Sequence, residues 1–481
     1  MSHTTSIPTR SFGFYLNGNW LIHGREAVIT SPFDHSVVAV VNEATRDDVE
    51  TAIQLAVESF AVTRKLSSHQ RSSVLRKIAE GIRARHEEFA RTICQEAGKP
   101  IKTARIEVDR GIYTFDVAAE EASRIYGEYI PLDTLEATAG RWGLMRRFPI
   151  GPVFAITPFN FPLNLVAHKV APAIAAGCPL ILKPAPQTPV TALMLAEVVH
   201  ESGWPQGALA VMPLSNDDAA VLVSDDRVKL MTFTGSAPVG WALRSKAGKK
   251  HVTLELGGNA AVIVHSDADL AYAAQRCVAG GFAYGGQTCI SVQRILVERS
   301  VCDEFTNLVL DGVHKLKSGD PMHEDTDIPP LIRESDAVRA TLWIDEAVQA
   351  GAKLLAGGKR HGPFVEPTVL TNTTPDMRVN CAEVFAPVVT VEPYDSVREA
   401  VAEINHSTFG LQAGVFTQDA RLIQLAFEEL EVGGVIVGDV PSFRVDQMPY
   451  GGIKESGIGR EGLRYSIEDM TERKLMVMAL R

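Results

Sequence analysis

The stretch PVFAITPFNFPLNLVAHKVAPAIAAGCPLILKPAPQTPVTALMLAEVVHES, residues 152–202, determines the fold class. Two short apolar runs, PVFAIT and LILKP, alternate in it with two segments of helical periodicity. The alternation continues through LAVMPL, KLMTFT and HVTLEL as far as residue 256. Short apolar strands that alternate with helices predict parallel βαβ units and an open α/β sheet. Such a sheet binds ligands where its strands end and its helices begin.

The segments on either side of this sheet predict further elements. Residues 45–125 carry apolar residues at every third or fourth position, which indicates long amphipathic helices. Residues 127–151 have weak helical periodicity and flanks that could pair as a long hairpin, a common oligomer contact. A second alternation of strands and helices starts at Asn259 and predicts another α/β domain, and KLMVMAL at 474–480 could return as an edge strand.

Length and charge narrow the classes of function. A chain of 481 residues is expected to form two or three domains, and its 46% hydrophobic and 22% charged residues are typical of globular proteins. The net charge of −11 would repel nucleic acid and an anionic membrane surface. There is no apolar run long enough to span a bilayer and no signal-peptide pattern in residues 1–20, so we expect a cytoplasmic protein.

One cysteine stands in an unusual context. The six cysteines form no CxxC pair and have no metal-ligand spacing, so we expect no metal site and a structural role for most of them: Cys94, Cys178, Cys277, Cys289, Cys302 and Cys381. Cys289, however, lies in GGFAYGGQTCIS, residues 280–291, among four glycines. Small neighbours leave a thiolate accessible and backbone N–H groups free to bind an oxyanion. Cys289 is therefore a candidate nucleophile.

Polar side chains follow three of the predicted strands. Glu255 ends the strand VTLE and precedes two glycines, where a general base could be held, although most such glutamates are solvated. Asn160 in ITPFNFP is either a turn residue or an amide donor to an oxyanion. Lys183 in LILKP is either a surface lysine or a ligand of a ribose hydroxyl or phosphate.

Two glycine-containing segments have patterns that are typical of pyrophosphate binding, and only the first has the sequence context that such binding needs. FTGSAPVG, residues 233–240, predicts a strand-to-helix turn with Gly235 and Ser236 at its start, which suits phosphate binding but also an ordinary helix cap. Gly457, Gly459 and Gly462 spell GxGxxG, but no apolar strand precedes them and too few residues follow for a βαβ unit. We therefore interpret this second segment as a loop.

Together these segments resemble the aldehyde dehydrogenase superfamily over essentially the whole chain. The motifs LELGG around Glu255 and FAYGGQTC around Cys289 are similar to the two active-site signatures of the family, and PFNFP, LKPAPQTP, FTGS, AEVFAP and PYGGIKESGIGRE follow in the family's order. The similarity is greatest to the lactaldehyde and non-phosphorylating glyceraldehyde-3-phosphate dehydrogenase group. A non-enzymatic structural protein would have no reason to combine these residues.

The resemblance implies a role for each motif residue. Cys289 would be the nucleophile, Asn160 and the Cys289 N–H the oxyanion hole, and Glu255 the base that activates water to hydrolyse a thioester. NAD or NADP would contact Thr157, Lys183, Gly235, Ser236, Glu383 and Phe385. Relatives that transfer the acyl group to coenzyme A generally lack the glutamate, so Glu255 favours hydrolysis over a coenzyme A-acylating semialdehyde dehydrogenase.

The resemblance also implies three parts of an α/β aldehyde dehydrogenase fold. Residues 1–126 and 149–257 would form a Rossmann-like cofactor-binding domain, and residues 258–451 an α/β catalytic domain. Residues 127–148 and 465–481 would form a small β arm that assembles a homodimer or homotetramer.

This sequence departs from the family in two places. Many NAD-preferring members have the sequence KPSE, with an acid three residues after the lysine, whereas this chain has Lys183, Pro184, Ala185 and Pro186. Without that carboxylate a 2′-phosphate is not repelled, so NADP becomes acceptable as well as NAD. Ala386 replaces a glycine in AEVFAP, and we have no interpretation of this change.

The expected substrate channel is unusually basic. Alignment on the family places Phe161, His168, Arg444 and Tyr450 where members that oxidise apolar aldehydes have aromatic residues, and places Arg110 at the entrance. Arginine binds carboxylate, phosphate or sulfonate well. We therefore predict a short hydroxylated or anionic aldehyde as the small-molecule substrate. The alternative is that both arginines form structural ion pairs with acids such as Asp109 or Asp446.

Overall fold

The structure is a computed structural model that describes residues 10–479. Its first sheet has eight strands in the order β24-β12-β11-β8-β9-β10-β2-β3. The five central strands are parallel, which confirms the open α/β sheet expected from residues 152–256: β8 (Val153–Ile156), β9 (Leu180–Lys183), β10 (Leu209–Val211), β11 (Leu230–Thr234) and β12 (His251–Glu255). At the edges lie β2 (Phe14–Leu16), β3 (Asn19–Leu21) and β24 (Gly457–Ile458).

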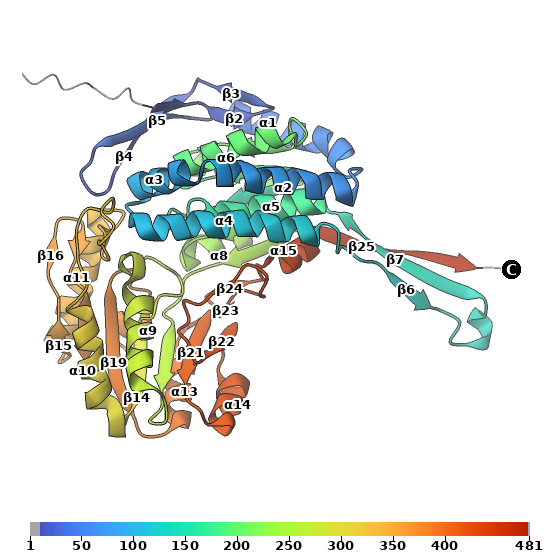
Figure 1. The fold of residues 1–481 in the computed structure, drawn as a ribbon. Coiled ribbons are helices and arrows are strands. Elements are labelled where there is room, and N and C mark those ends of the chain that lie inside the picture. The colour runs from blue at the N-terminus through green and yellow to red at the C-terminus, as the bar shows by residue number, and fades with distance from the viewer. Residues whose placement is uncertain (1–9, 480–481) are drawn as a thin grey trace, which may run out of the picture.

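Alternate residues of these strands pack on opposite faces of the sheet, as the two-residue repeat requires. Val153 and Ala155 belong to one apolar core and Phe154 to the other. The first core includes residues of α2 (Ser68–Ala84), α3 (His86–Ala97), α4 (Ile101–Glu121), α5 (Asn164–Ala176), α6 (Pro189–Ser202) and α15 (Leu463–Asp469), which lie together in Figure 1. The second includes residues of α1 (Arg46–Thr63), α7 (Asn216–Ser224) and α8 (Ala237–Lys246).

The helical stretch expected at residues 45–125 is divided into four helices by local capping signals. Thr45 and Asp48 form a capping box at the start of α1, and Ser67 and Gln70 form another at the start of α2. Gly98 ends α3 in the left-handed region with φ of +65°. These caps explain why one amphipathic pattern becomes separate helices.

A second sheet of seven strands lies below the first in Figure 1. Its order is β15-β18-β19-β14-β13-β21-β22, and only the edge strand β15 is antiparallel. The strands are β13 (Ala261–Val264), β14 (Arg294–Glu298), β15 (Lys353–Ala356), β18 (Thr368–Thr371), β19 (Val388–Tyr394), β21 (Gln412–Phe416) and β22 (Gly434–Val437). The helices of this part are α9 (Leu270–Phe282), α10 (Cys302–Val313), α11 (Glu334–Gln349), α12 (Arg378–Cys381), α13 (Val397–Asn405) and α14 (Ala420–Glu429).

Shorter elements complete these two layers. The remaining strands are β1 (Arg10–Phe12), β4 (Arg25–Thr30), β5 (Val37–Glu43), β16 (Arg360–His361), β17 (Phe364–Val365), β20 (Phe409–Gly410) and β23 (Ile453–Lys454). Three short 3₁₀ helices are η1 (Glu136–Thr138), η2 (Ala283–Gly286) and η3 (Arg299–Val301). None of the described helices is long and apolar enough to cross a membrane.

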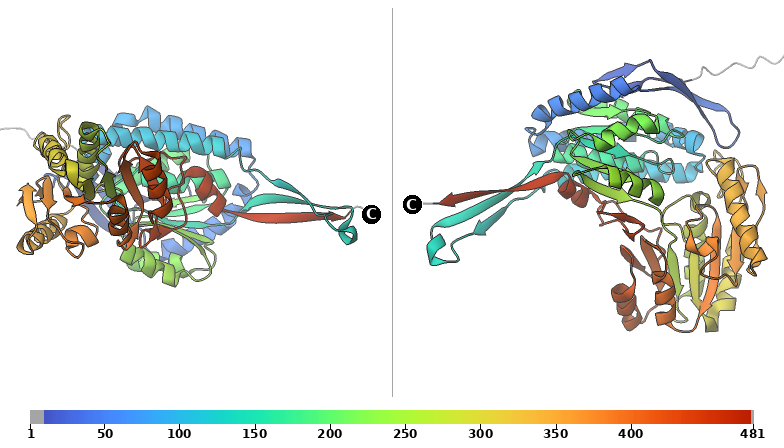
Figure 2. Two further views of the ribbon diagram at one scale, coloured as in Figure 1. Left: turned by 90° about the horizontal axis from the view of Figure 1, so that it is seen from below. Right: turned by 180° about the vertical axis from the view of Figure 1, so that it is seen from behind.

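A three-stranded antiparallel arm projects from the molecule (Figures 1 and 2). It consists of β6 (Glu128–Pro131), β7 (Arg141–Pro149) and β25 (Thr471–Ala479), with β7 in the centre. Residues 127–151 thus form the hairpin that their pattern suggested. The C-terminal strand begins only at Thr471, because the preceding segment forms α15, whose Leu463 and Ile467 are buried in the core of the first sheet.

The two sheets are joined where the functional motifs lie. Residues 256–260 lead directly from β12 into β13, so the end of one sheet faces the beginning of the other. The GxGxxG segment also reaches this junction. It is not entirely a loop, because β24 pairs with β12 through Glu255 and Gly457.

A buried ion pair fixes the helices beside this junction. Lys99 Nζ lies 2.5 Å from Glu107 Oε2, and both side chains are almost wholly buried. The other oxygen of Glu107 accepts the Leu163 and Asn164 N–H groups at the start of α5, at 3.0 and 3.1 Å. Lys99 Nζ also lies 3.5 Å from the centre of the Phe161 ring. This pair therefore holds α4 against the segment that contains Asn160 and Phe161.

Substituting Glu107→Ala should destabilise the protein strongly, because it leaves the Lys99 ammonium group buried without a partner. Removal of one member of a buried pair costs about 3–5 kcal/mol. Urea unfolding followed by circular dichroism measures the change. Asp395→Ala is the matched control, since it breaks an ion pair with Arg299 whose side chains are 59% and 64% exposed. Equal stability losses in the two variants would contradict the role given to Glu107.

Candidate active site

A cavity of about 730 Å³ lies at the junction of the two sheets. Most residues singled out from the sequence line it: Arg110, Asn160, Phe161, Gly235, Ser236, Glu255, Cys289, Glu383, Phe385, Arg444 and Tyr450. Thr157, Lys183 and His168 do not line this cavity, although each is buried next to residues that do. Segments separated by more than 300 residues in the chain are thus brought to one place.

The loop before Cys289 depends on its glycines. Tyr284, Gly285 and Gly286 all adopt left-handed φ values, of 51°, 64° and 73°. A Cβ atom on Gly286 would lie 2.2 Å from the carbonyl oxygen of Ala386, so no other residue fits there. The Tyr284 hydroxyl donates to the Ala97 carbonyl at 2.7 Å, which anchors the strained loop to the first sheet. This conformation presents Cys289 to the cavity.

The Cys289 thiol is half-buried and lies 3.0 Å from the Tyr450 hydroxyl. Burial raises the pKa of Cys289 to about 11, against the hydrogen bond from Tyr450 and the positive charge of Arg444, which both lower it. Only the thiolate is a strong nucleophile. Tyr450 and Arg444 are therefore the groups that favour the reactive form of this cysteine.

Glu255 is a buried carboxyl group whose side-chain oxygens have no hydrogen-bond partner among residues 10–479. Burial raises its pKa well above the usual value, and the negative charge of Glu461 raises it further. A carboxylate with a raised pKa is a stronger base near neutral pH. Glu255 therefore has the properties of a general base toward a small molecule such as water.

Asn160 connects the first sheet to the cysteine loop. Its Nδ2 atom donates to the carbonyl oxygen of Gln287 at 2.9 Å, two residues before Cys289. An amide nitrogen carries two hydrogens, so one remains for a second acceptor. The arrangement suits an oxyanion hole, provided that the acceptor forms beside the Cys289 sulfur.

The side of the cavity that faces α8 suits a dinucleotide. Ser236 is the N-cap residue of α8 and makes no side-chain capping bond, so its hydroxyl and the first N–H groups of the helix remain available to a pyrophosphate. The nearby Thr234 hydroxyl is buried without a partner in the described part of the chain. Glu383, which also lines the cavity, accepts the Gly258 N–H at 3.0 Å, and burial raises its pKa to about 7. Phe385 contacts Phe159 edge-on.

Lys183 and Thr157 lie at the carboxyl ends of the two neighbouring strands. The Thr157 N–H donates to the Lys183 carbonyl at 3.2 Å. Burial lowers the pKa of the Lys183 ammonium group, an effect that Glu43 opposes. These two residues are outside the cavity that contains Cys289, so a contact with the adenosine half of a cofactor remains a prediction.

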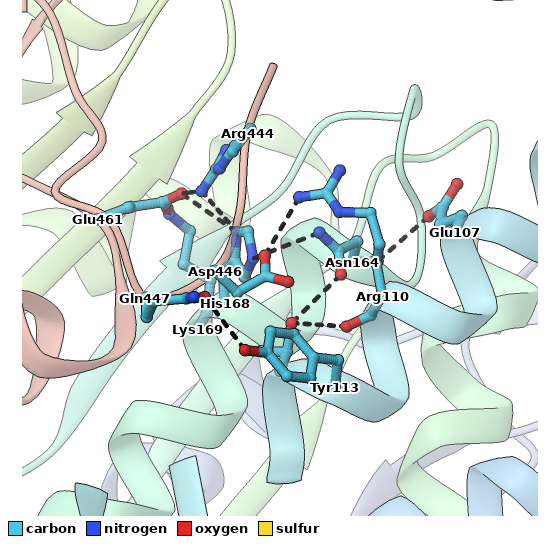
Figure 3. A network of polar contacts seen from close by, with 11 residues as sticks. Glu107, Arg110, Tyr113, Asn164, His168, Lys169, Arg444, Asp446, Gln447 and Glu461 are labelled. Carbon is cyan, nitrogen blue, oxygen red and sulfur yellow. Dashed lines mark hydrogen bonds and ion pairs between the residues drawn. The ribbon is translucent and has the colours of Figure 1, made fainter. Parts of the chain in front are cut away.

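Both channel arginines line the cavity, and both also form ion pairs (Figure 3). Arg110 lies 3.1 Å from Asp446, and Arg444 lies 2.9 Å from Glu461. Asp109, the other acid considered from the sequence, instead contacts His86. The Arg444 guanidinium also stacks on the Tyr450 ring at 3.6 Å. Ion pairing and exposure to the cavity therefore coexist at these residues.

Sequence reasoning missed two charged residues of the site. Glu461 and Lys169 are each about 1% exposed and contact one another. Burial acts to raise the pKa of Glu461, but Lys169, His168 and Arg444 hold it well below its usual value, so it is a carboxylate. Glu461 ends the motif SGIGRE, and Lys169 follows His168 in a buried helix. A lysine in an otherwise apolar helix was the available signal.

Comparison with known proteins decides the family. The model of the aldehyde dehydrogenase family matches residues 22–476. The chain belongs to this family. It is 44% identical to the 3-sulfolactaldehyde dehydrogenase of Priestia megaterium, over 99% of this chain and 100% of that protein. Aldehyde dehydrogenase 21 of Physcomitrella patens in complex with succinate superposes with a TM-score of 0.97 at 46% identity, covering 98% and 99% of the two chains.

A third relative bears on the cofactor. The glyceraldehyde-3-phosphate dehydrogenase of Methanocaldococcus jannaschii complexed with NADP is 36% identical, with a TM-score of 0.91, over 95% of this chain and 100% of that one. The aldehyde dehydrogenase fold and the family predicted from the sequence are confirmed. The protein is an NAD(P)-dependent oxidoreductase of aldehydes, and the non-enzymatic alternative is excluded.

Alkylation of Cys289 by iodoacetamide in this dehydrogenase should become faster as the pH rises toward 11, because the thiolate fraction increases up to the pKa of about 11. Tyr450→Phe removes the hydrogen bond that lowers the pKa of Cys289. In this variant the curve of alkylation rate against pH should therefore shift to higher pH, and the alkylation rate at pH 8 should fall by about tenfold. Peptide mass spectrometry must assign the label, with the exposed Cys381 as internal control. A profile unchanged by Tyr450→Phe would show that the hydroxyl does not act on the thiol.

Proposed function

We propose that this enzyme oxidises a short anionic aldehyde to its carboxylic acid through a covalent thioester on Cys289. The observation that carries the proposal is the placement of a cysteine, an unpartnered buried carboxylate and two arginines around one cavity. The mechanism follows from the groups nearest the sulfur, and the substrate class follows from the arginines.

Cys289 would add to the aldehyde carbon as its thiolate and form a tetrahedral alkoxide. The free N–H of Asn160 and the main-chain N–H of Cys289 would donate to that oxygen, so their contribution is largest when the charge has developed. Bound NAD(P)+ would supply an acceptor for the hydride that leaves the carbon. Cys289 then carries a thioester, with Glu383 and Phe385 on the cofactor side of the cavity.

Glu255 would release the product by taking a proton from the water that attacks the thioester. The carboxyl oxygens make no bond within the described chain, so nothing competes with the water for them. A raised pKa suits this role. The competing reaction is transfer of the acyl group to coenzyme A, and an assay without coenzyme A distinguishes the two. Turnover that requires coenzyme A would overturn the hydrolytic proposal.

Glu255→Gln should allow the thioester to form but not to be hydrolysed. A single burst of NAD(P)H close to one equivalent per subunit is expected, followed by steady turnover reduced by at least about 100-fold, as is typical for loss of a general base. Intact-protein mass spectrometry should find the acyl group on the enzyme. Cys289→Ser is the matched control and should give neither burst nor adduct. Steady turnover at the wild-type rate in Glu255→Gln would refute the role of this base.

The arginines favour a substrate with a negative charge a few bonds from the aldehyde. Arg110 and Arg444 reach the cavity from α4 and from the loop after β22, and guanidinium groups bind carboxylate and sulfonate oxygens in pairs. Relatives named for sulfolactaldehyde and glyceraldehyde 3-phosphate, and one bound to succinate, act on or bind small anions. We propose the sulfonated and carboxylated aldehydes of three or four carbons as the first candidates, with lactaldehyde as the uncharged alternative.

Arg444→Leu should discriminate between charged and uncharged substrates. We expect kcat/KM for succinate semialdehyde to fall by about 10–100-fold, the value of a hydrogen bond to a charged group, and that for the neutral methyl ester of the same aldehyde to fall much less. Arg110→Leu tests the second arginine in the same way. Both substrates will lose some activity in Arg444→Leu because Arg444 also lowers the pKa of Cys289. An equal loss on both would remove the anion hypothesis.

The proposals for cofactor preference, subunit assembly and domain boundaries each rest on a single observation or on the resemblance to the family. Pro186 stands where many NAD-preferring members have the acid of KPSE, which should permit NADP as well as NAD. The projecting arm exposes Leu475, Met476 and Val477, as expected of a contact with another subunit in a homodimer or homotetramer. We also propose that residues 1–126 and 149–257 form the cofactor domain and residues 258–451 the catalytic domain.

A further inference from the structure

We propose that His168 is a positioning residue that fixes the Arg444 guanidinium for the anionic group of the substrate. This inference rests on the proposed function above. The sequence alone suggested that His168 itself lines the channel. In the structure His168 is 4% exposed and absent from the cavity wall, whereas Arg444 lines the cavity and contacts His168.

The neighbours of His168 define one tautomer of its ring. Arg444 places a guanidinium nitrogen 2.8 Å from Nδ1, closer than the 3.4 Å to Glu461 Oε2, and because a guanidinium can only donate, this shorter contact has Nδ1 as its unprotonated acceptor. Nε2 then carries the hydrogen and donates to Asp446 Oδ1 at 2.7 Å. In this arrangement the imidazole links the two residues, because it accepts from an arginine on one side and donates to a carboxylate on the other.

The same carboxylate oxygen connects the two channel arginines. Asp446 Oδ1 also accepts from Arg110 at 3.1 Å, so a continuous chain of hydrogen bonds runs from Arg110 through Asp446 and His168 to Arg444 (Figure 3). Burial acts to raise the pKa of Asp446, but His168, Arg110 and Arg444 hold it well below its usual value. Asp446 is therefore charged, and a loss of His168 would disconnect the two arginines from each other.

The bonds that hold Arg444 leave donors free for a ligand. His168 and Glu461 both accept from the same terminal nitrogen of Arg444, at 2.8 and 2.9 Å. The Nε–H of Arg444 is buried and has no partner among residues 10–479. A buried unpaired donor is costly, and an oxygen of a bound carboxylate or sulfonate would satisfy it. His168 thus directs the remaining donors of Arg444 toward an acceptor that the chain does not supply.

The alternative is that His168 merely fills space beside Arg444. The two roles differ in what a substitution does to the charged substrate. Leucine removes both hydrogen bonds while keeping an apolar side chain. Glutamine replaces the ring by an amide that can still accept from Arg444 and donate to Asp446. Both variants leave Cys289, Glu255 and Asn160 in place.

The experiment measures KM and kcat of the wild type, His168→Leu and His168→Gln. The substrates are succinate semialdehyde, written below as the anion 4-oxobutanoate, and its methyl ester. For His168→Leu we expect KM for 4-oxobutanoate to rise by about tenfold, with kcat nearly unchanged and KM for the ester unaffected, because only binding of the anion is weakened. His168→Gln should recover most of the affinity for 4-oxobutanoate. If His168→Leu yields no folded protein, His168→Met replaces it as the variant without strong hydrogen bonds.

Each of the other possible results would overturn one stated part of the proposal. An equal rise in KM for both substrates, or a glutamine variant as impaired as the leucine variant, would show that His168 only fills space. The wild type could prefer 4-oxobutanoate to the ester while His168→Leu keeps the full preference. That result would overturn the role of His168 and leave the proposed substrate class intact. A wild type without any preference for the anion would instead overturn the substrate class in the proposed function.

Discussion

The site depends on the buried carboxylate of Glu461. It contacts Lys169 and Arg444, and its charge also acts on Glu255, so three functional side chains are held or tuned by one group. A buried charge is tolerated only when it is paired and hydrogen-bonded, and Glu461 has both forms of compensation. The negative charge of Glu461 acts on the ionisable groups around it. It favours the charged form of the neighbouring cations and makes the nearby carboxyl group of Glu255 more basic. The reactive residues therefore owe much of their character to a residue that does not line the cavity.

A second constraint is steric and concerns the backbone between the two sheets. Cys289, the proposed nucleophile, lies in the loop before β14 of the second sheet, whereas Glu255 ends β12 and Asn160 follows β8 in the first. Gly286 packs against the Ala386 carbonyl, and a Cβ atom on Gly451 would lie 2.8 Å from Glu255 Oε1. Close approach of this kind needs glycine. These glycines bring the facing loops close enough for Asn160 to bond to the loop of Cys289.

Local patterns in the sequence are sufficient to predict the sheet and many of the residues that line the cavity, because strands, helix starts and glycine-rich loops have local causes. Cys289 was recognisable from its four glycines, and Glu255 from its place at a strand end. The network around His168 was not predictable in the same way. Arg110, His168 and the C-terminal segment that carries Asp446 and Glu461 lie far apart in sequence, and which of them meet is decided by how α4, α5 and that segment pack. The two-residue strand β24 within the GxGxxG segment, which was interpreted as a loop, was missed for the same reason, since it forms by pairing with β12.

Arg444 combines two functions that oppose one another. Its positive charge lowers the pKa of Cys289, and its unpaired Nε–H is suited to an anion. An anion bound to Arg444 cancels part of its field at the sulfur, so tighter binding of the substrate makes the thiolate less favourable. With the anionic substrate proposed above, Arg110 would share the anion and so reduce this conflict, because the positive charge that lowers the pKa of Cys289 is that of Arg444. The hydrogen-bonded link between the two arginines would then let the site divide the charge of a bound anion between Arg444, which acts on the Cys289 thiol, and Arg110.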